Sequence, residues 1–306
     1  MKKTKIVRTI AELRSEIAAY RSRAIVNGVR PSVGFVPTMG YLHEGHASLI
    51  RRSVEDNGLT VLSIFVNPIQ FGPNEDFDKY PRDEERDIRV AGESGADLAF
   101  LPSVEEMYPK RRVTTVAVAD VTDRLCGAAR PGHFDGVATV VTKLLNIVQP
   151  DRAYFGLKDA QQVAVVSRMA EDLNLPVEIV ACPIVREPDG LALSSRNVYL
   201  SPEEREQALS LSGALAKVPE WIREGYTAER LSLALKEDIG RYPLAEVEYV
   251  EALAYPELLP LEENVPLSET EGSLLVALAV RFGRTRLIDN RLLNPKEVGA
   301  ELCFAK

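Results

Sequence analysis

The sequence predicts an α/β protein: a doubly wound, Rossmann-like parallel sheet followed by a second, smaller α+β domain. Short apolar segments alternate with amphipathic helical segments through the first part of the chain, and this alternation stops near residue 185. Such alternation is typical of a parallel sheet with helices on both faces. The chain has 306 residues, more than one hydrophobic core usually holds. We therefore expect two domains, residues 1–185 and 186–306.

The expected strands of the first domain are short, apolar and closed by proline, glycine or polar residues. They lie at 32–37, 59–66, 96–101, 152–155 and 177–185, after a short strand near the N-terminus, and residues 114–119 have the composition of one more. Segments with helical spacing of apolar residues lie at 10–25, 44–56, 83–94, 135–148 and 159–173. Right-handed crossovers between these strands would give a doubly wound sheet.

The character of the sequence changes after residue 185. Residues 186–197 are irregular, and a helix start then follows at residues 201–204, with Ser201 as N-cap, proline at the first position and glutamate at the third. Two helices are expected up to about residue 241, and strands at 246–254 and 274–282. We expect residues 186–306 to form a C-terminal lid domain.

Composition and charge argue against several classes of protein. Hydrophobic residues make up 45% of the chain and charged residues 27%, as in globular proteins. The net charge of -8 disfavours non-specific binding to nucleic acid. No apolar run approaches the ~20 residues of a membrane span, and no apolar segment follows the basic N-terminus as in a signal peptide. We therefore expect neither a nucleic-acid partner nor a membrane.

The three cysteines, Cys126, Cys182 and Cys303, are far apart in the sequence. No CxxC spacing suggests a zinc site or a redox pair, and three thiols cannot all pair within the chain. Free thiols fit a reducing compartment, so we expect a cytoplasmic protein.

Two of the three histidines lie within four residues, in the stretch Pro37-Thr38-Met39-Gly40-Tyr41-Leu42-His43-Glu44-Gly45-His46. This stretch joins an expected strand to an expected helix, and ligands of open parallel sheets bind at the carboxyl ends of strands. A helix N-terminus there offers N–H donors to phosphate, and Gly45 permits close approach. His43 and His46 are three residues apart and can face the same ligand. The alternatives are two ordinary surface histidines, or a metal site that lacks third and fourth ligands nearby.

Two further polar segments accompany expected strand ends and helix starts. Residues 67–74 follow the second buried strand, and the neutral amides of Asn67 and Gln70 can hold a hydroxyl and a carboxylate. Residues 130–137 precede a helix and place Arg130 beside the third histidine, His133. Each segment could equally be a plain turn or a helix cap.

Two other segments carry cations. In Gly156-Leu157-Lys158-Asp159-Ala160-Gln161-Gln162, Lys158 suits phosphate oxygens, and Asp159 can cap a helix or approach a metal. The stretch Leu193-Ser194-Ser195-Arg196-Asn197 joins two hydroxyls to an arginine, an anion clamp placed where a lid could close over a nucleotide. The alternatives are a solvated lysine with a capping aspartate, and a polar linker. No G-x-x-x-x-G-K-[ST] or G-x-G-x-x-G motif occurs, which disfavours P-loop hydrolases and dinucleotide oxidoreductases.

With these segments, the sequence closely resembles the pantoate–β-alanine ligases, or pantothenate synthetases, over nearly its whole length. The resemblance runs through Pro-Thr-Met-Gly-x-Leu-His-x-Gly-His at 37–46, Phe-Val-Asn-Pro-x-Gln-Phe at 65–71, Tyr-Pro-Arg at 80–82, Arg-Pro-Gly-His-Phe at 130–134, Phe-Gly-x-Lys-Asp at 155–159, Ser-Ser-Arg-Asn at 194–197 and Thr-Arg-Leu-Ile-Asp-Asn at 285–290. His-x-Gly-His alone belongs to a wider adenylyl-transferring superfamily, whereas the whole set is specific to this ligase.

The resemblance implies that pantoate attacks the α-phosphate of ATP and that β-alanine then attacks the pantoyl adenylate. It implies Mg²⁺ with the ATP, without an assigned protein ligand, and a homodimer. The implied catalytic residues are His43, His46 and Lys158, with His46 as proton donor. The implied ATP site consists of Met39, Gly40, Tyr41, Leu42, His43, Glu44, Gly45, His46, Gly156, Leu157, Lys158, Asp159, Val185, Leu193, Ser194, Ser195 and Arg196. The implied site for pantoate and β-alanine consists of Pro37, Met39, Asn67, Gln70, Arg130, His133 and Gln162.

Two features depart from the family pattern, and two other functions stay open. Leu193 stands where the family usually has methionine, a change that keeps side-chain volume, and residues 255–272 form a longer, acidic loop. A related adenylyltransferase with a phosphorylated acceptor would need basic residues where Gln70 and Gln162 are neutral. A non-enzymatic nucleotide-binding module would not need Gln70, Gln162 and His46 together.

Overall fold

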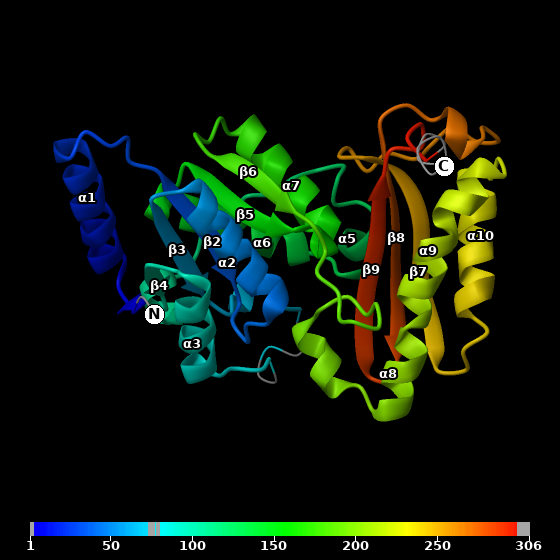
Figure 1. Ribbon diagram of the computed structural model, residues 1–306, viewed down its shortest axis with the longest axis horizontal. Coiled ribbons are helices and arrows are strands. Elements are labelled where there is room, and N and C mark those ends of the chain that lie inside the picture. Colours follow the sequence, from blue (N-terminus) through cyan, green and yellow to red (C-terminus); the bar gives the residue numbers. More distant parts are fainter. Residues whose placement is uncertain (1–2, 73–76, 78–79, 299–306) are drawn as a thin grey trace, which may run out of the picture. The chain divides into compact units, whose positions relative to one another are not determined.

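The computed structural model describes residues 3–72, 77 and 80–298 (Figure 1). The predicted features at Pro73, Asn74 and Cys303 lie outside the described residues. The chain forms two compact units: residues 1–118, 130–157 and 165–185 make up the first, and residues 119–129, 158–164 and 186–306 the second. The second unit includes two segments from earlier in the chain, which the sequence does not separate from the first domain. The expected division into domains at residue 185 stays a prediction.

The first unit is built on a six-stranded sheet in the order β1-β4-β3-β2-β5-β6, and every strand pair in it is parallel. Its strands are β1 (Lys5–Val7), β2 (Val33–Thr38), β3 (Leu59–Ile64), β4 (Leu98–Phe100), β5 (Arg152–Gly156) and β6 (Glu178–Cys182). Its helices are α1 (Ile10–Val26), α2 (Glu44–Asp56), α3 (Glu84–Ser94), α4 (Val104–Met107) and α6 (His133–Val148), and α7 (Ala160–Asp172) continues into it from the second unit. The predicted fold class is confirmed.

The strand expected at 114–119 is wrong. These residues form neither helix nor strand, and most of their side chains are exposed. The N–H of Val116 donates to the Thr139 hydroxyl of α6 at 3.0 Å instead of joining a sheet. Valine and alanine alternate after Thr114 and Thr115, a pattern that is typical of a strand, but these residues pair with no strand.

The helices cover both faces of the sheet (Figure 1). Helix α2 packs against α3, α1 packs against α6, and the Thr142 hydroxyl of α6 donates to Met169 Sδ of α7 at 3.0 Å. Right-handed crossovers place α2 and α3 on one face and α1, α6 and α7 on the other. The chain thus leaves β2 toward one face and the neighbouring β5 toward the other, which makes this pair the topological switch point. Ligands of doubly wound folds bind beside the carboxyl ends of strands at such a point.

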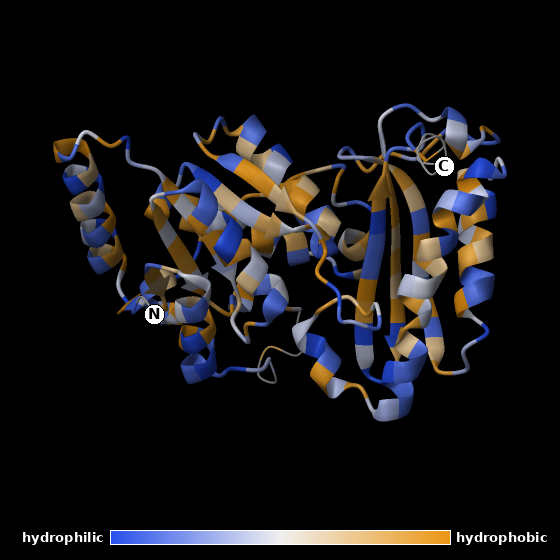
Figure 2. Cartoon of the chain, in the orientation of Figure 1, coloured by the Kyte–Doolittle hydropathy of each residue, from blue (hydrophilic) through white to orange (hydrophobic). Residues whose placement is uncertain are grey.

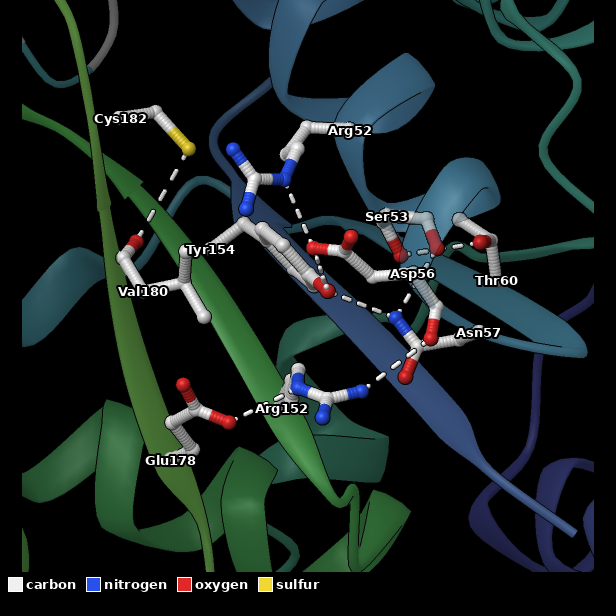
Figure 3. A network of polar contacts seen from close by, with 10 residues as sticks. All are labelled: Arg52, Ser53, Asp56, Asn57, Thr60, Arg152, Tyr154, Glu178, Val180 and Cys182. Carbon is white, nitrogen blue, oxygen red and sulfur yellow. Dashed lines mark hydrogen bonds and ion pairs between the residues drawn. The ribbon is translucent and has the colours of Figure 1, made fainter. Parts of the chain in front are cut away.

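Polar side chains attach the C-terminal end of α2 to β5 (Figure 3). Tyr154 is fully buried, and its hydroxyl accepts from Asn57 Nδ2 at 2.7 Å and donates to Asp56 Oδ2 at 3.1 Å. Arg52 Nε donates to the same Asp56 oxygen at 2.7 Å. This bond to Arg52 is the main cause of a lowered Asp56 pKa, and burial raises the pKa of Tyr154. The network fixes one end of the helix that has His43 and His46 at its other end.

The second unit contains the antiparallel sheet β7-β8-β9. Its elements are α5 (Leu125–Ala129), α8 (Pro202–Ala208), α9 (Ser210–Arg223), α10 (Ala228–Ile239), β7 (Ala245–Tyr255), β8 (Ser273–Phe282) and β9 (Thr285–Leu293). The helix start predicted at Ser201 is confirmed, because Ser201 Oγ accepts the Glu204 N–H at 3.2 Å and Glu204 Oε2 accepts the Ser201 N–H at 2.8 Å. Three helices follow it within the described residues, where the sequence predicts two. The sequence does not predict strand β9. Its polar residues interrupt the apolar pattern that marks β8 (Figure 2).

Helices α9 and α10 share a hydrophobic core with the small sheet, which includes Leu215, Leu235 and Leu278. The long loop at 255–272 reaches this core through Leu267, which is 1% exposed and whose N–H donates to Tyr226 O at 2.9 Å. Among the described residues, no helix is both long and apolar enough to span a membrane.

Candidate active site

The histidine segment leaves the carboxyl end of β2 and enters α2, as the sequence predicts. His43 is the N-cap of α2, and its Nδ1 accepts the Gly45 N–H at 3.1 Å. His46 Nδ1 accepts the His43 N–H at 3.3 Å, and the two ring centroids lie 4.1 Å apart. A neutral imidazole that accepts at Nδ1 carries its proton on Nε2, so these hydrogen bonds assign an Nε2–H donor to each ring. The N-terminus of α2 therefore combines two imidazole donors with the positive end of the helix dipole, a favourable site for phosphate.

A buried carboxylate on α3 holds the turn that precedes these histidines. Asp87 is 2% exposed and accepts the N–H of Tyr41 at 2.9 Å and of Leu42 at 2.6 Å. Burial raises the pKa of Asp87, and the two amide hydrogen bonds oppose that shift. Gly40 has a φ of 86°, and a Cβ there would lie 2.8 Å from Asp87 Oδ2. Only glycine fits this turn without displacing the carboxylate.

The sequence prediction does not include Asp87. On α3 the buried side chains are those of Asp87, Ala91 and Ser94, a spacing of four and then three residues. An acidic residue on the apolar stripe of an otherwise amphipathic helix is a signal that could identify it, because buried carboxylates need partners.

Side chains from three distant segments meet around Gln70 in the first unit. Gln70 Nε2 donates to Met39 Sδ at 2.9 Å, and Asn67 Nδ2 donates to Gln70 Oε1 at 3.2 Å. Arg130 Nη1 lies 3.0 Å from His133 Nε2, and His133 Nδ1 lies 2.9 Å from Gln70 O. Because arginine can only donate, His133 accepts at Nε2 and donates from Nδ1 to the Gln70 carbonyl. The described parts of the segments at 37–46, 67–74 and 130–137 therefore form one cluster.

This cluster is closely packed against α6. The 3₁₀ helix η1 (Pro68–Gln70) contacts α6 at Gly136, and the Gly136 carbonyl accepts from Asn67 Nδ2 at 3.2 Å. A Cβ at Gly136 would lie 2.5 Å from both Gln70 Cα and Ile69 O. Asn67 and Gln70 are both buried, so their side-chain amides bond to protein groups and not to solvent.

The cationic side chains of the two cation-bearing segments, Lys158 and Arg196, belong to the second unit. Lys158 is part of the short 3₁₀ helix η2 (Leu157–Asp159), and its Nζ lies 3.7 Å from Asp159 Oδ2. Ser194 caps the 3₁₀ helix η3 (Ser195–Tyr199) by accepting the Arg196 N–H at 3.2 Å. Leu193 and Gln162 are half-buried in the same unit. Gly156, Leu157 and Val185 lie in the first unit, the first of them at the end of β5 beside the switch point.

Comparison with known proteins identifies the family. The sequence pattern that describes pantoate-beta-alanine ligases matches residues 5–292. The chain belongs to this family. A pantothenate synthetase of Pelotomaculum thermopropionicum is 54% identical over 289 residues, which cover 94% of this chain and 98% of that protein. The pantothenate synthetase of Acetivibrio thermocellus is also 54% identical, over 287 residues covering 94% and 98%.

Solved structures of the family have the same fold. The pantothenate synthetase of Thermus thermophilus is 47% identical, covers 95% of this chain and 99% of its own, and gives a TM-score of 0.84. A pantoate-beta-alanine ligase of Francisella tularensis, complexed with beta-gamma ATP and beta-alanine, is 32% identical with the same coverage and a TM-score of 0.74. The resemblance stated from the sequence is confirmed, and the roles of the individual site residues stay predictions.

Proposed function

We propose that this chain condenses (R)-pantoate with β-alanine in an ATP-dependent reaction that proceeds through pantoyl adenylate and releases AMP and pyrophosphate. One observation in the structure carries the proposal. The loop that presents His43 and His46 at the N-terminus of α2 also places Met39 against Gln70. A phosphate-binding helix end and a neutral amide site thus share one loop, an arrangement suited to joining a phosphate to a small hydroxy acid.

In the first step, a carboxylate oxygen of pantoate attacks the α-phosphorus, the bond to the bridging oxygen breaks, and pyrophosphate leaves. The Nε2–H groups of His43 and His46, with the N-terminus of α2, stabilise the charge that grows on the leaving group. His46 is the proposed proton donor, and Lys158 completes the proposed catalytic set. The protein mainly positions the reactants and neutralises charge.

In the second step, the amine of β-alanine attacks the acyl carbon, loses a proton, and releases AMP. The proposed acid and amine site consists of Pro37, Met39, Asn67, Gln70, Arg130, His133 and Gln162. The proposed ATP site consists of residues 39–46, 156–159, Val185 and 193–196, in which Ser194, Ser195 and Arg196 clamp the phosphates together with Lys158. A lid formed by residues 186–197 would keep water from the mixed anhydride.

Mg²⁺ is proposed to accompany ATP. Within the residues that the structure describes, no group of three or more histidine, cysteine, aspartate or glutamate side chains is arranged to hold a metal ion. Phosphate oxygens and water are the ordinary ligands of Mg²⁺ in nucleotide sites. The ion would therefore enter with the triphosphate and neutralise its charge. A homodimer is proposed from the habit of the family, and a cytoplasmic location from the wide separation of the three cysteines in the sequence.

Pyrophosphate exchange tests the reaction class. With pantoate and Mg²⁺ but no β-alanine, the protein should incorporate labelled pyrophosphate into ATP. The first step is reversible, and labelled pyrophosphate can replace the released pyrophosphate while pantoyl adenylate stays bound. Omission of pantoate should abolish the exchange, and a phosphate monoester offered in its place should not restore it. Binding of ATP without pantoate-dependent exchange would refute the proposal and favour a nucleotide-binding module.

A further inference from the structure

Strand β9 carries two consecutive buried polar residues that no step of the proposed reaction uses. Asp289 and Asn290 are 3% and 4% exposed. They belong to the family motif at 285–290, which lies in strand β9. Successive side chains of a strand point to opposite faces of the sheet, so the two residues reach different segments of the second unit.

Asp289 binds the residue at which the 186–197 segment begins. Its Oδ2 accepts from Arg186 Nη1 at 2.7 Å and its Oδ1 accepts from Arg186 Nη2 at 2.8 Å. Asp289 Oδ1 also accepts the Asn290 N–H at 2.7 Å. A two-pronged arginine–carboxylate pair fixes orientation as well as distance. Arg186 is therefore held in one geometry relative to β9.

Hydrogen bonds lead from Arg186 to the anion clamp, residues 194–196. Arg186 Nη1 donates to Gly190 O at 3.1 Å, and the backbones of Arg186 and Ala192 form an antiparallel bridge that closes this turn. Asn197 Nδ2, in η3 directly after the clamp, donates to Ala192 O at 3.1 Å. The clamp is thus tied to β9 through one compact turn.

Asn290 binds the other proposed phosphate-holding segment. Its Nδ2 donates to the backbone carbonyl of Lys158 at 3.0 Å. This bond involves the backbone carbonyl and not the lysine ammonium, which lies 3.7 Å from Asp159 Oδ2. It fixes the backbone from which the side chain of Lys158 extends.

We infer that Asp289 and Asn290 are positioning residues that hold the anion clamp and Lys158 at a fixed separation, so that both bind the same triphosphate. The inference rests on the proposed function, because it takes Lys158 and residues 194–196 as the phosphate ligands. A rigid strand is a more precise support than the turns that carry these groups. The expected consequence is a specific effect on ATP, and none on the two smaller substrates.

Substitution of Asn290 tests the lysine branch. Asn290→Ala should raise the KM for ATP by about tenfold, the loss that one buried hydrogen bond can cause, and leave the KM for pantoate and β-alanine unchanged. In a Lys158→Ala background the same substitution should add almost nothing, because its effect passes through Lys158. The matched control is Asn294→Ala, which removes a surface hydrogen bond to Glu297 Oε1 of 3.0 Å beyond the end of β9. It should leave all three KM values unchanged.

Substitution of the ion pair tests the clamp branch. Arg186→Lys keeps the positive charge but loses the two-pronged geometry, and it should raise the KM for ATP while the KM values for pantoate and β-alanine stay unchanged. Asp289→Asn should do the same, and the double variant should be no worse than the more severe single one. If Asp289→Asn does not fold, Arg186→Lys alone decides this branch.

Two results would overturn the inference. One is that the Asn290→Ala and Arg186→Lys variants both fold and both lose thermal stability while their KM for ATP stays unchanged. That result would show that the two residues have a purely structural role. The other is full additivity of Asn290→Ala with Lys158→Ala. Failure of the proposed function is distinguishable, because it would appear as missing pantoate-dependent exchange in the unmodified protein. Direct calorimetric titration with ATP would still test the positioning role in that case.

Discussion

Gly136→Ala should damage the proposed pantoate site by displacing the backbone of η1. An ordinary Cβ contact lies at 3.4–4 Å, whereas a Cβ at Gly136 would lie 2.5 Å from Gln70 Cα and Ile69 O. Both are backbone atoms, so η1 must retreat as a whole. A retreat of about 1 Å at a group that positions a substrate can cost on the order of 100-fold in rate. Overpacking of this kind also lowers stability by about 1–3 kcal/mol.

The assay is pyrophosphate exchange at varied pantoate concentration, together with thermal unfolding. The kcat/KM for pantoate should fall by about 100-fold while direct ATP binding is retained, because Gln70 and not the phosphate loop is displaced. Gly213→Ala is the matched control, since a Cβ at that position in α9 has no heavy atom within 4 Å. It should raise stability by about 0.4–1 kcal/mol and leave the exchange unaffected. An unchanged kcat/KM for pantoate in Gly136→Ala would show that η1 does not set the position of Gln70.

Three further predictions concern other parts of the first unit and the clamp. His46→Ala should lower pyrophosphate exchange by about 100-fold or more with little change in melting temperature, and an unaltered rate would remove His46 from the mechanism. Leu193→Met should leave activity within a few-fold, because the two side chains have similar volume; a larger change would make this family departure functional. Asp56 has a lowered pKa in the folded protein, mainly through the Arg52 hydrogen bond, so its contribution to stability is complete above the ordinary carboxyl pKa of ~3.9 and is lost as pH falls through the folded value. Asp56→Asn should therefore lower stability at neutral pH and converge with the unmodified protein in acid, and parallel stability curves across this range would contradict the assignment.

Much of the fold follows from local pattern. The central strands β2, β3 and β4 of the parallel sheet are mostly apolar because they are covered on both faces. The helix at Ser201 has a local hydrogen-bonded start. Strand β9 cannot be predicted from the hydrophobic pattern. Its buried residues Asp289 and Asn290 are polar, and their burial depends on hydrogen bonds to Arg186 and Lys158. The strand prediction at 114–119 is wrong for the opposite reason. These residues have the composition of a strand but pair with no strand.

For the candidate site, too, one part could be predicted from the sequence and another could not. Segments at the ends of strands could be predicted, because a parallel sheet brings all its carboxyl ends to one edge. The contact between Gln70 and Met39, and the one between Gln70 and His133, fulfil that expectation within the first unit. The partners that hold these segments could not be predicted, because Asp87 is 45 residues from Leu42 in the sequence, and no local pattern specifies that pairing.

Asp87 fixes the loop before the histidines, and the burial of its carboxylate carries a desolvation cost. Burial raises its pKa, so in the folded protein the charged form is disfavoured relative to water. Its contribution to stability is therefore greatest below the ordinary carboxyl pKa and falls as pH rises through the raised folded value. An apolar side chain in this place would avoid the desolvation of a charged carboxylate at neutral pH. Such a side chain would leave the N–H groups of Tyr41 and Leu42 without their acceptor, and the turn that leads into His43 would lose its fixed geometry. The buried carboxylate is thus explained by the position of the histidines, and a loop with this support can present both Nε2–H donors before the phosphate charge develops.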